Sequence, residues 1–514
     1  IISIKIFAAV KMWNALAVLF TVVLSVLCKD AFEIETERQN LMKKEMDMML
    51  GSDIVLNDSE QRANELIMKL KFYELDNAFS EPQIFNLSKH FFQWKDEVKS
   101  TQIFQIIKNM PKGAVLHAHD TGFLSPDYVL KITYWDDLYV CFVEEDVHFK
   151  FSRDIPADFC ITEWQLMRDA RYSSGNVKKF DAKLRQHFTI VIDNPNDVYT
   201  DINKVWNAFQ QYFITTGPLL YYKPAWEQYF YETLKALRDD NIMYIEIRSV
   251  LPNLYDLDTQ YTIIDTAKSY KEVVDNFVME YPDFFGAKLI YAPLRNVDEK
   301  TVKKYIKTAK KIKHMMPDFF AGFDLVGQED LGTPTKEFVT TLAEAANDLN
   351  FFFHAGETNW YGTTSDENLY NVILLGTKRI GHAFAIVKHP VLIEEIKKRD
   401  IPLEVNVISN IVLKLVDDAR NHPLATFIAQ GLPVVISSDD PGVWEANPLS
   451  TDFYAAFIGV ASRLHDLRLL KQLALNSLQY SSLEEIKKKE AFEKFEAKWD
   501  EFKKHCDIFF YHDN

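Results

Sequence analysis

Two ionisable side chains follow the three consecutive aromatic residues at positions 351–353. The aromatic run indicates a short buried strand, and this strand ends on His354-Ala-Gly-Glu357. A neutral ring nitrogen of His354 can bind a metal ion. Glu357 follows a glycine that lets the backbone come close, so its carboxyl group can exchange protons with a molecule held on that metal. A core histidine and an exposed glutamate would give the same pattern, so other stretches must decide.

Three further apolar runs end on residues of the same chemical kind. His117 and His119 end the first run, and they share one face because residues two apart on a strand point the same way. His382 ends another run, and Asp439 and Asp440 end the last one. Adjacent carboxylates repel each other unless a cation or a substrate donor stabilises them. Each fragment alone has a structural explanation, but their joint occurrence favours a metal-dependent active site.

This set of residue types indicates a hydrolytic metal centre. Three histidines and one carboxylate, with one position left open, suit a catalytic zinc ion. Zinc lowers the pKa of its water to about 7, which makes hydroxide available at neutral pH. A nearby histidine can accept the proton of that water, and a carboxylic acid can protonate the leaving side of the electrophile. The residues therefore predict metal-assisted hydrolysis of a polarised carbon.

The four stretches belong to a longer series of apolar runs that alternate with helical patterns from Gly113 onward. Alternating strands and helices indicate an α/β fold with a parallel sheet. Eight such units predict a TIM-type (β/α)₈ barrel, whose chemistry lies at the carboxyl ends of its strands. The predicted strands cover residues 113–120, 242–250, 287–295, 320–327, 350–357, 379–384, 402–409 and 433–441.

Two parts of the chain do not fit a plain barrel. The gap between Asp120 and Ile242 is too long for one crossover, so we expect an inserted subdomain at about residues 124–190. Cys141 and Cys160 lie in it, and an oxidising compartment would allow them to pair. Residues 29–108 are charged and helical in pattern, at 32–50, 58–75 and 84–110, and indicate a helical appendage used for packing or self-association.

The N-terminus and the composition point to an extracellular protein. Residues 1–28 contain a short apolar run typical of a signal peptide, and residues 1–11 precede a suitable start at Met12. A buried N-terminal helix is the alternative. Two sequons, at Asn57 and Asn86, would be glycosylation sites in a secreted chain. The formal net charge of −16 argues against nucleic acid as a partner, and no internal apolar run has the roughly 18 residues of a membrane span.

Four motifs closely resemble those of the adenosine deaminase family: HAHD at 117–120, HAGE at 354–357, GH at 381–382 and SSDDPG at 437–442. The signal peptide, the appendage and the insertion are similar to those of its secreted branch, the adenosine deaminase 2-like growth factors. YIEIR at 244–248 and GFDLVG at 322–327 also resemble that branch. The resemblance covers all the barrel strands, and it implies a deaminase barrel over residues 109–514.

The resemblance also assigns the parts of the site. It implies one zinc ion per chain, with Glu357 as the proton donor to purine N1 and a raised pKa of that carboxyl group through burial. His382 would orient and deprotonate the attacking water. The implied zinc ligands are His117, His119, His354 and Asp439.

Four further residues would bind the substrate in such an enzyme. Asp440 would hydrogen-bond to purine N7, and the backbone of Gly327 would approach N3. Asp120 follows the second histidine directly, as in the secreted branch, and would contact the ribose. Trp206 belongs to an aromatic stretch that resembles a substrate cover, although ordinary core packing would explain it as well.

The expected function is that of a secreted zinc-dependent adenosine deaminase, which converts adenosine and 2′-deoxyadenosine to inosine and deoxyinosine with release of ammonia. The resemblance implies a homodimer built by residues 29–108 and an insertion that contacts a cell-surface receptor. One alternative is a deaminase of AMP or another adenine compound, although no cationic clamp for a phosphate lies beside the strand ends. Another is an extracellular growth factor or binding protein that keeps the fold without the reaction.

Overall fold

The computed structural model describes residues 13, 30–144 and 146–512. The predicted signal peptide, residues 1–28, lies outside the described residues except for Trp13. Among the residues that are described, no helix combines the length and the apolar character needed to cross a membrane.

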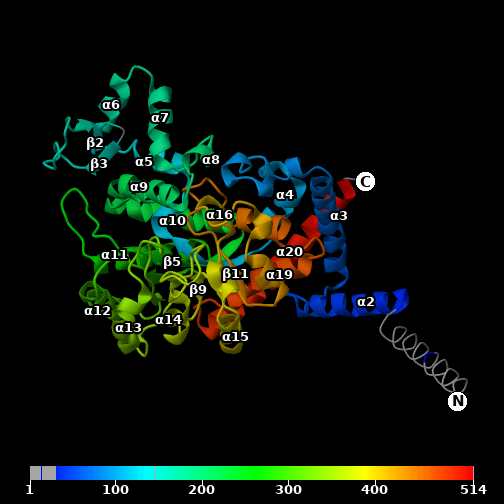
Figure 1. Cartoon of the computed structure of the whole chain (residues 1–514). Coiled ribbons are helices and arrows are strands. Elements are labelled where there is room, and N and C mark those ends of the chain that lie inside the picture. The colour runs from blue at the N-terminus through cyan, green and yellow to red at the C-terminus, as the bar shows by residue number, and fades with distance from the viewer. Residues whose placement is uncertain (1–12, 14–29, 145, 513–514) are drawn as a thin grey trace, which may run out of the picture.

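Eight parallel strands form the centre of the molecule, one in each predicted run (Figure 1). One sheet has the order β1-β5-β6-β7 and the other β11-β10-β9-β8. Single parallel bridges, Phe323 to Phe351 and Ala118 to Asp439, join the two sheets at both edges, so the ring of strands closes. The strands are β1 (Gly113–His119), β5 (Ile242–Ser249), β6 (Ala287–Tyr291), β7 (Phe320–Phe323), β8 (His354–Ala355), β9 (Ile380–His382), β10 (Leu403–Val405) and β11 (Val434–Ile436).

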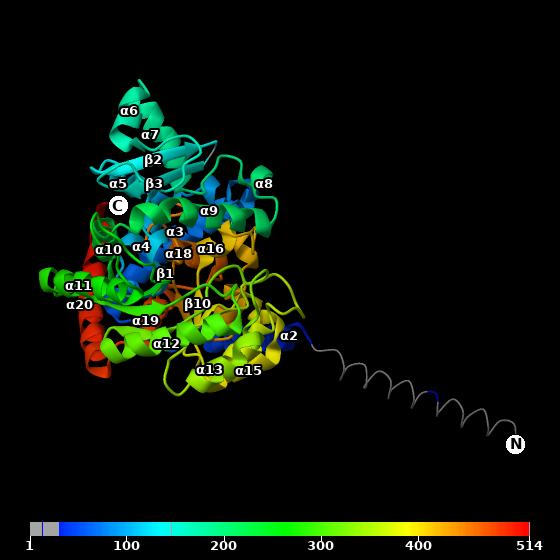
Figure 2. The same ribbon diagram turned by 90° about the vertical axis from the view of Figure 1, so that its left-hand side faces the viewer.

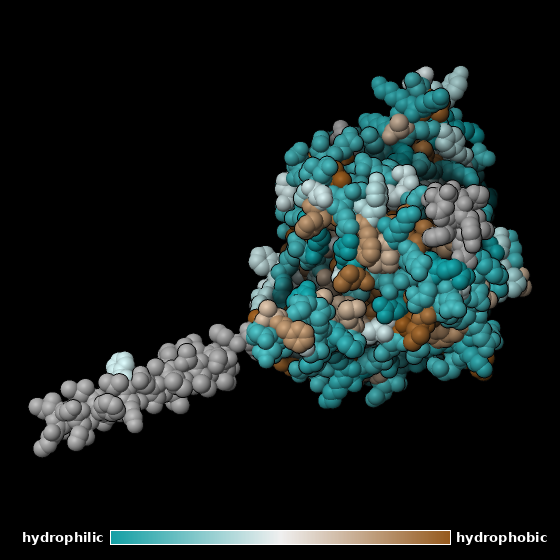
Figure 3. Space-filling model, turned by 90° about the vertical axis from the view of Figure 1, so that its right-hand side faces the viewer, coloured by the Kyte–Doolittle hydropathy of each residue, from teal (hydrophilic) through white to brown (hydrophobic). Residues whose placement is uncertain are grey.

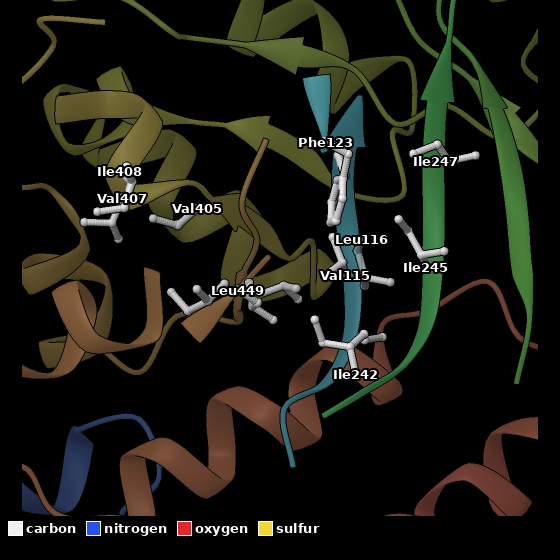
Figure 4. Packing of buried hydrophobic residues seen from close by; sticks show 14 of the residues in the cluster. Val115, Leu116, Phe123, Ile242, Ile245, Ile247, Val405, Val407, Ile408 and Leu449 are labelled. Atoms are coloured by element: carbon white, nitrogen blue, oxygen red, sulfur yellow. The ribbon is translucent and has the colours of Figure 1, made fainter. Parts of the chain in front are cut away.

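Crossover helices connect successive strands, as a barrel of parallel strands requires. Branched apolar side chains make up much of the core around the strands, with Val115 and Leu116 of β1, Ile245 of β5 and Val405 of β10 among the buried residues drawn in Figure 4. The connecting helices are α10 (Lys223–Asp239), α11 (Ile263–Glu280), α12 (Glu299–Met315), α13 (Val339–Ala345), α14 (Asn368–Leu374), α15 (Pro390–Arg399), α16 (Val407–Val412) and α17 (Leu424–Ala429). After the last strand, α19 (Leu467–Gln479) packs against β1 and β11.

The insertion after β1 projects from one end of the molecule (Figures 1 and 2). It contains an antiparallel sheet of order β3-β2-β4 and short helices, after which α9 (Ile202–Leu220) returns to the barrel. The predicted disulfide is confirmed, since Cys141 and Cys160 are bonded with their Cα atoms 6.1 Å apart. The elements are α5 (Pro126–Ile132), β2 (Leu138–Val143), β3 (Asp146–Phe151), β4 (Gln165–Leu166), α6 (Met167–Ser173) and α7 (Val177–Arg185).

The N-terminal region contains α2 (Ala31–Met48), α3 (Asp58–Ser80) and α4 (Gln102–Asn109). The predicted helical stretch over 84–110 was wrong as a single helix: short 3₁₀ helices separated by turns precede α4, which begins only where the Thr101 side chain caps the Phe104 amide. The region also packs more closely than an appendage would. Glu60 of α3 is buried and accepts hydrogen bonds from Lys471 and from Trp499 of α20 (Glu485–His512). The face of the molecule seen in Figure 3 is largely hydrophilic, with small apolar patches.

Candidate active site

Four histidines meet at the carboxyl ends of β1, β8 and β9. The ring centroid of His117 lies 5.4 Å from that of His119, 4.5 Å from that of His354 and 4.9 Å from that of His382. Asp439, three residues after the end of the neighbouring β11 at Ile436, lies among them. The strand ends therefore converge as predicted, since His117 and Asp439, more than 300 positions apart in the chain, lie next to each other.

Two overlapping groups of these side chains could hold a metal ion, within each of which the ligand atoms lie within 4.8 Å of one another. One consists of His117, His354, His382 and Asp439, and the other of His119, Asp439 and Asp440. The structure thus brings the four predicted ligands together, but it also brings His382 close enough to compete for a ligand position. Hydrogen bonding distinguishes the histidines.

Two of the imidazole rings contact a carboxylate through the nitrogen that faces away from the cluster. Nδ1 of His117 lies 2.7 Å from Glu404 Oε2, and Nδ1 of His354 lies 2.6 Å from Asp324 Oδ2. A carboxylate on Nδ1 keeps the proton there and leaves Nε2 bare, as in histidines that bind zinc. Nε2 of His117 is buried and has no hydrogen-bond partner. An orphaned imidazole nitrogen in such a place fits a metal ligand.

The Asp439 carboxylate has two different sides. Oδ2 accepts a hydrogen bond from the Ser409 hydroxyl at 2.7 Å. Oδ1 lies 3.1 Å from Nε2 of His119 and 3.4 Å from Nε2 of His117, close to the separation of about 3.4 Å expected between ligands in a tetrahedral zinc site. Burial raises the pKa of Asp439, but its close contacts with the His117 and His119 rings outweigh this effect and hold the pKa well below its usual range.

Backbone strain helps to aim two of these side chains. His382 and Asp439 have φ angles of 60° and 59°, in the left-handed region that residues other than glycine seldom adopt. Such a conformation costs on the order of 1–3 kcal/mol and persists only where its surroundings hold it. The strained residues lie at the strand ends where the predicted chemistry lies.

Beneath the histidines lies a chain of buried charges that sequence reasoning missed. Arg248 donates to Asp324 at 2.8 Å and to Glu404 at 2.7 Å, and Arg379 donates to Glu404 at 2.5 Å and to Glu246 at 2.6 Å. All five side chains are almost completely buried. Ionisable residues inside otherwise apolar strand runs were the available signal, because burial of a charge demands a partner.

Glu357 occupies a different environment. Its backbone amide donates to Glu329 at 2.7 Å, and its side-chain Oε1 is buried without a hydrogen-bond partner. Oε1 lies 3.5 Å from Nδ1 of His382. Burial, followed by the charges of Asp439 and Glu329, raises the pKa of Glu357 well above its usual value. The raised pKa agrees with the direction expected from the sequence and favours the protonated form, from which Glu357 could donate a proton.

The predicted substrate residues lie around this centre. Asp440 is buried with an unpartnered Oδ1, and burial and the Asp439 charge raise its pKa well above the usual value. Gly122 lies so close that a Cβ atom there would be 1.9 Å from this oxygen. Gly327 has a φ angle of 107°, which turns its backbone in a way that other residues seldom adopt.

Two other predicted residues have their own protein contacts. The carboxylate of Asp120 accepts hydrogen bonds from the Tyr270 hydroxyl at 2.6 Å and from the Thr121 amide at 2.8 Å. Trp206, on α9, is buried and packs edge-on against Phe209 with the ring centroids 5.3 Å apart. The start of α9 reaches the strand ends, since Asn203 accepts a hydrogen bond from Gln328, next to Gly327, but substrate contact by Trp206 remains a prediction.

The arrangement combines a set of metal-ligand atoms with a buried carboxyl group whose pKa is raised. Bare imidazole nitrogens and one ionised carboxylate fit a divalent ion such as zinc, with Glu357 available beside it as an acid. Such a site can activate water and protonate the atom next to the carbon that the water attacks. This chemistry suits the hydrolysis of a ring amidine.

Comparisons with known proteins agree with this geometry. The family model described as "Adenosine deaminase" matches residues 177–498, and the one described as "Adenosine/AMP deaminase N-terminal" matches residues 15–107. The chain is 42% identical to an adenosine deaminase of Aedes albopictus over 472 residues, which cover 91% of this chain and 88% of the relative. It is 41% identical to human adenosine deaminase 2 over 480 residues, which cover 92% of this chain and 94% of the relative.

Solved structures of deaminases share the fold. An adenine deaminase of Arthrobacter aurescens has a TM-score of 0.55 at 17% identity, covering 75% of this chain and 98% of its own. An N6-mAMP deaminase of Arabidopsis also has a TM-score of 0.55, at 19% identity, and covers 76% of this chain and 99% of its own. At these identities the likeness shows the α/β barrel architecture alone.

Proposed function

Because the chain belongs to the adenosine deaminase family and is an adenosine deaminase, we propose that it is a secreted, zinc-dependent enzyme acting on adenosine and 2′-deoxyadenosine. The products are inosine and deoxyinosine, with ammonia released in both cases. The observation that carries the proposal is the convergence of imidazole and carboxylate ligands beside the buried Glu357 carboxyl group, whose pKa is raised.

The zinc ion would be held by His117, His119, His354 and Asp439. When bound, zinc supplies the activation of the water that attacks purine C6. The carboxylates of Glu404 and Asp324 support this assignment, because they keep the proton of their histidine away from the metal side.

The chain's own side chains do the remaining work. Glu357 gives its proton to purine N1 as the water oxygen bonds to C6. One proton of that water then goes to the amino nitrogen, so that the bond from C6 to nitrogen breaks with release of ammonia, and the other returns to Glu357. Asp440, kept protonated by its buried position, donates a hydrogen bond to N7. The backbone of Gly327 faces N3, Asp120 contacts the ribose, and Trp206 covers the bound substrate.

Secretion, glycosylation and assembly belong to the same proposal. The signal peptide at residues 1–28 and the disulfide between Cys141 and Cys160 support an extracellular protein, since disulfides persist in oxidising compartments. Asn57 and Asn86 would carry glycans. Residues 29–108 would form a homodimer, and the insertion would contact a cell-surface receptor.

The decisive experiment measures loss of adenosine absorbance and release of ammonia by the mature protein, before and after removal of zinc with a chelator. We expect chelation to abolish conversion of adenosine to inosine and added zinc to restore it. AMP serves as the competing substrate. Absence of turnover by folded, zinc-loaded protein would refute the enzyme, and faster turnover of AMP would refute the nucleoside as substrate.

A single variant tests the proton donor. Glu357→Gln keeps the size of the side chain but removes the acidic proton, so we expect kcat to fall by about 10²–10⁴-fold. Asp330→Asn is a matched control, because the charge of Asp330 also raises the pKa of Glu357 but has a smaller effect than burial or the charges of Asp439 and Glu329. Near-normal turnover by Glu357→Gln would refute the assignment.

A further inference from the structure

His382 differs from His117 and His354 in what its inner ring nitrogen faces. Carboxylates lie against Nδ1 of the latter two, at 2.7 and 2.6 Å. The side-chain amide nitrogen of Asn410 lies against Nδ1 of His382, at 3.2 Å. An amide NH₂ group donates hydrogen bonds and cannot accept them, so Nδ1 of His382 must be the acceptor.

A second histidine fixes the orientation of that amide. The backbone N–H of Leu424 donates to Nδ1 of His422 at 3.0 Å, and Nε2 of His422 lies 2.9 Å from Oδ1 of Asn410. Because a backbone N–H can only donate, Nδ1 of His422 accepts and the ring proton resides on Nε2. Burial lowers the pKa of His422 to about 3, so the ring is neutral and has only this one proton.

Every contact in this chain therefore has one donor and one acceptor. The order is Leu424 amide, His422, Asn410, His382. Turning the Asn410 amide over would set its NH₂ group against the N–H of His422. It would also place the amide oxygen of Asn410 against Nδ1 of His382, which would then have to carry a proton to form a hydrogen bond. One obligate donor at the start thus determines the proton position in a side chain three contacts away.

We propose that His422 and Asn410 are positioning residues that hold His382 in the tautomer with its proton on Nε2. On the proposed function, on which this inference rests, His382 then orients the attacking water by donating a hydrogen bond to it. Nε2 is the ring nitrogen on the ligand side, 3.8 Å from Oδ2 of Asp439.

Two consequences follow for the site. Of the two tasks that family resemblance gives to His382, orienting the water is compatible with an N–H at Nε2, whereas removing its proton through that atom is not. A protonated Nε2 also cannot bind a metal. By position alone, His382 could bind the metal together with His117, His354 and Asp439. The proton on Nε2 excludes it, so His119 provides the third imidazole ligand.

The surroundings favour a persistent arrangement. His382, Asn410 and His422 are 2%, 0% and 3% exposed, so water does not compete for their hydrogen bonds. The ring of Phe384 packs edge-on against His422 with the centroids 5.5 Å apart. The Glu357 carboxyl group lies 3.5 Å from Nδ1 of His382. In its protonated form it is a further potential donor to that nitrogen, which also favours a His382 tautomer with a bare Nδ1.

A neutron crystal structure of the zinc-loaded, full-length enzyme tests the tautomer directly, because neutron diffraction locates protons. We expect a deuteron on Nε2 of His382 and another on Nε2 of His422, with both Nδ1 atoms bare. A deuteron on Nδ1 of His382 with a bare Nε2 would overturn the proposal. This measurement needs no turnover, so its result is separate from success or failure of the proposed function.

Variants test the consequence for the reaction. Asn410→Asp keeps the shape but turns the donor facing Nδ1 into an acceptor, which moves the His382 proton to Nδ1. We expect kcat to fall by about 10–100-fold with little change in KM, as for other partners of active-site histidines. The nitrogen-15 signal of Nε2 should change from that of a protonated to that of a bare nitrogen. Unchanged or faster turnover with the reversed tautomer would refute the orienting role.

A pair of His422 variants separates positioning from packing. His422→Phe keeps a ring but removes the donor to Asn410, whereas His422→Gln can keep an N–H in that place. We expect His422→Gln to retain much more of kcat, at equal zinc content. Equal losses in the two variants, with the nitrogen-15 signal of His382 unchanged, would show that His422 contributes packing alone and would refute the relay.

Discussion

Replacing Glu404 by glutamine tests whether the buried carboxylate under His117 is needed for metal binding. Glu404 accepts hydrogen bonds from His117 at 2.7 Å and Arg248 at 2.7 Å on one oxygen, and from Arg379 at 2.5 Å on the other. A glutamine side chain has one oxygen and one NH₂ group. Whichever way it turns, the NH₂ group meets at least one of these donors.

Two losses follow from this geometry. Breaking a buried ion pair costs about 3–5 kcal/mol of stability, because the partner charge remains buried. Loss of a carboxylate behind a metal-binding histidine lowers metal affinity by about 10–100-fold, which corresponds to about 1.4–2.7 kcal/mol. We therefore expect Glu404→Gln to unfold at lower denaturant concentration and to release zinc to a competing chelator more readily.

Glu246→Gln provides the control. Glu246 is also completely buried and also pairs with Arg379, at 2.6 Å, but its other partners are Tyr244 and Ser482 rather than a histidine. This variant should lose comparable stability and keep its zinc affinity. Zinc binding by Glu404→Gln as tight as in the original protein would refute the reasoning, as would an equal loss of affinity in both variants.

Three further predictions concern pH, glycosylation and substrate binding. Burial lowers the pKa of Lys71 to about 7, against about 10.4 in an unfolded chain. The unfolded state binds more protons between these values, so stability should rise with pH there, and a denaturation series should show that Lys71→Met removes this slope. Asn57 accepts hydrogen bonds from the amides of Ser59 and Glu60 as a helix cap. Asn57→Ala and Ser59→Ala should therefore both lose the glycan mass of the secreted protein, but only the first should lose about 1 kcal/mol of stability. In Gly122→Ala the new Cβ must displace the Asp440 side chain. We therefore expect KM for adenosine to rise about tenfold in steady-state assays. An unchanged KM would show that Asp440 does not bind the substrate.

The barrel strands could be predicted because each is a short apolar run that ends on polar residues. In a parallel barrel both faces of a strand are covered, so the run is nearly continuous, and its polar end marks the face where ligands bind. His117, His354, His382 and Asp439 were predictable for this reason. The length of each strand was not, because the chain at 350–353 pairs through a bridge and only His354–Ala355 continues as β8.

The partners of the histidines could not be predicted from local pattern. Arg248 and Glu404 are 156 residues apart in the chain, and both lie within otherwise hydrophobic runs. Periodicity reports which face is buried, but not which distant side chain meets it. Asn410 and His422 are closer in sequence, yet their roles depend on hydrogen-bond direction, which appears only when three side chains and one backbone amide are placed together.

The buried carboxylates and the metal can be treated as one electrostatic problem. Three carboxylates pair with two guanidinium groups, so the network has one excess negative charge when the carboxylates are ionised. The carboxylates are those of Glu246, Glu404 and Asp324, and the guanidinium groups those of Arg248 and Arg379. Asp439 adds a second, since its histidine contacts hold its pKa well below the usual range. Glu357 and Asp440, whose pKa values are raised, contribute no charge in their protonated forms. Two negative charges in a water-excluded barrel are costly alone and are balanced by one divalent ion. The same balance favours a neutral proton donor: burial already raises the pKa of Glu357, and the negative charge of Asp439, a proposed metal ligand, raises it further.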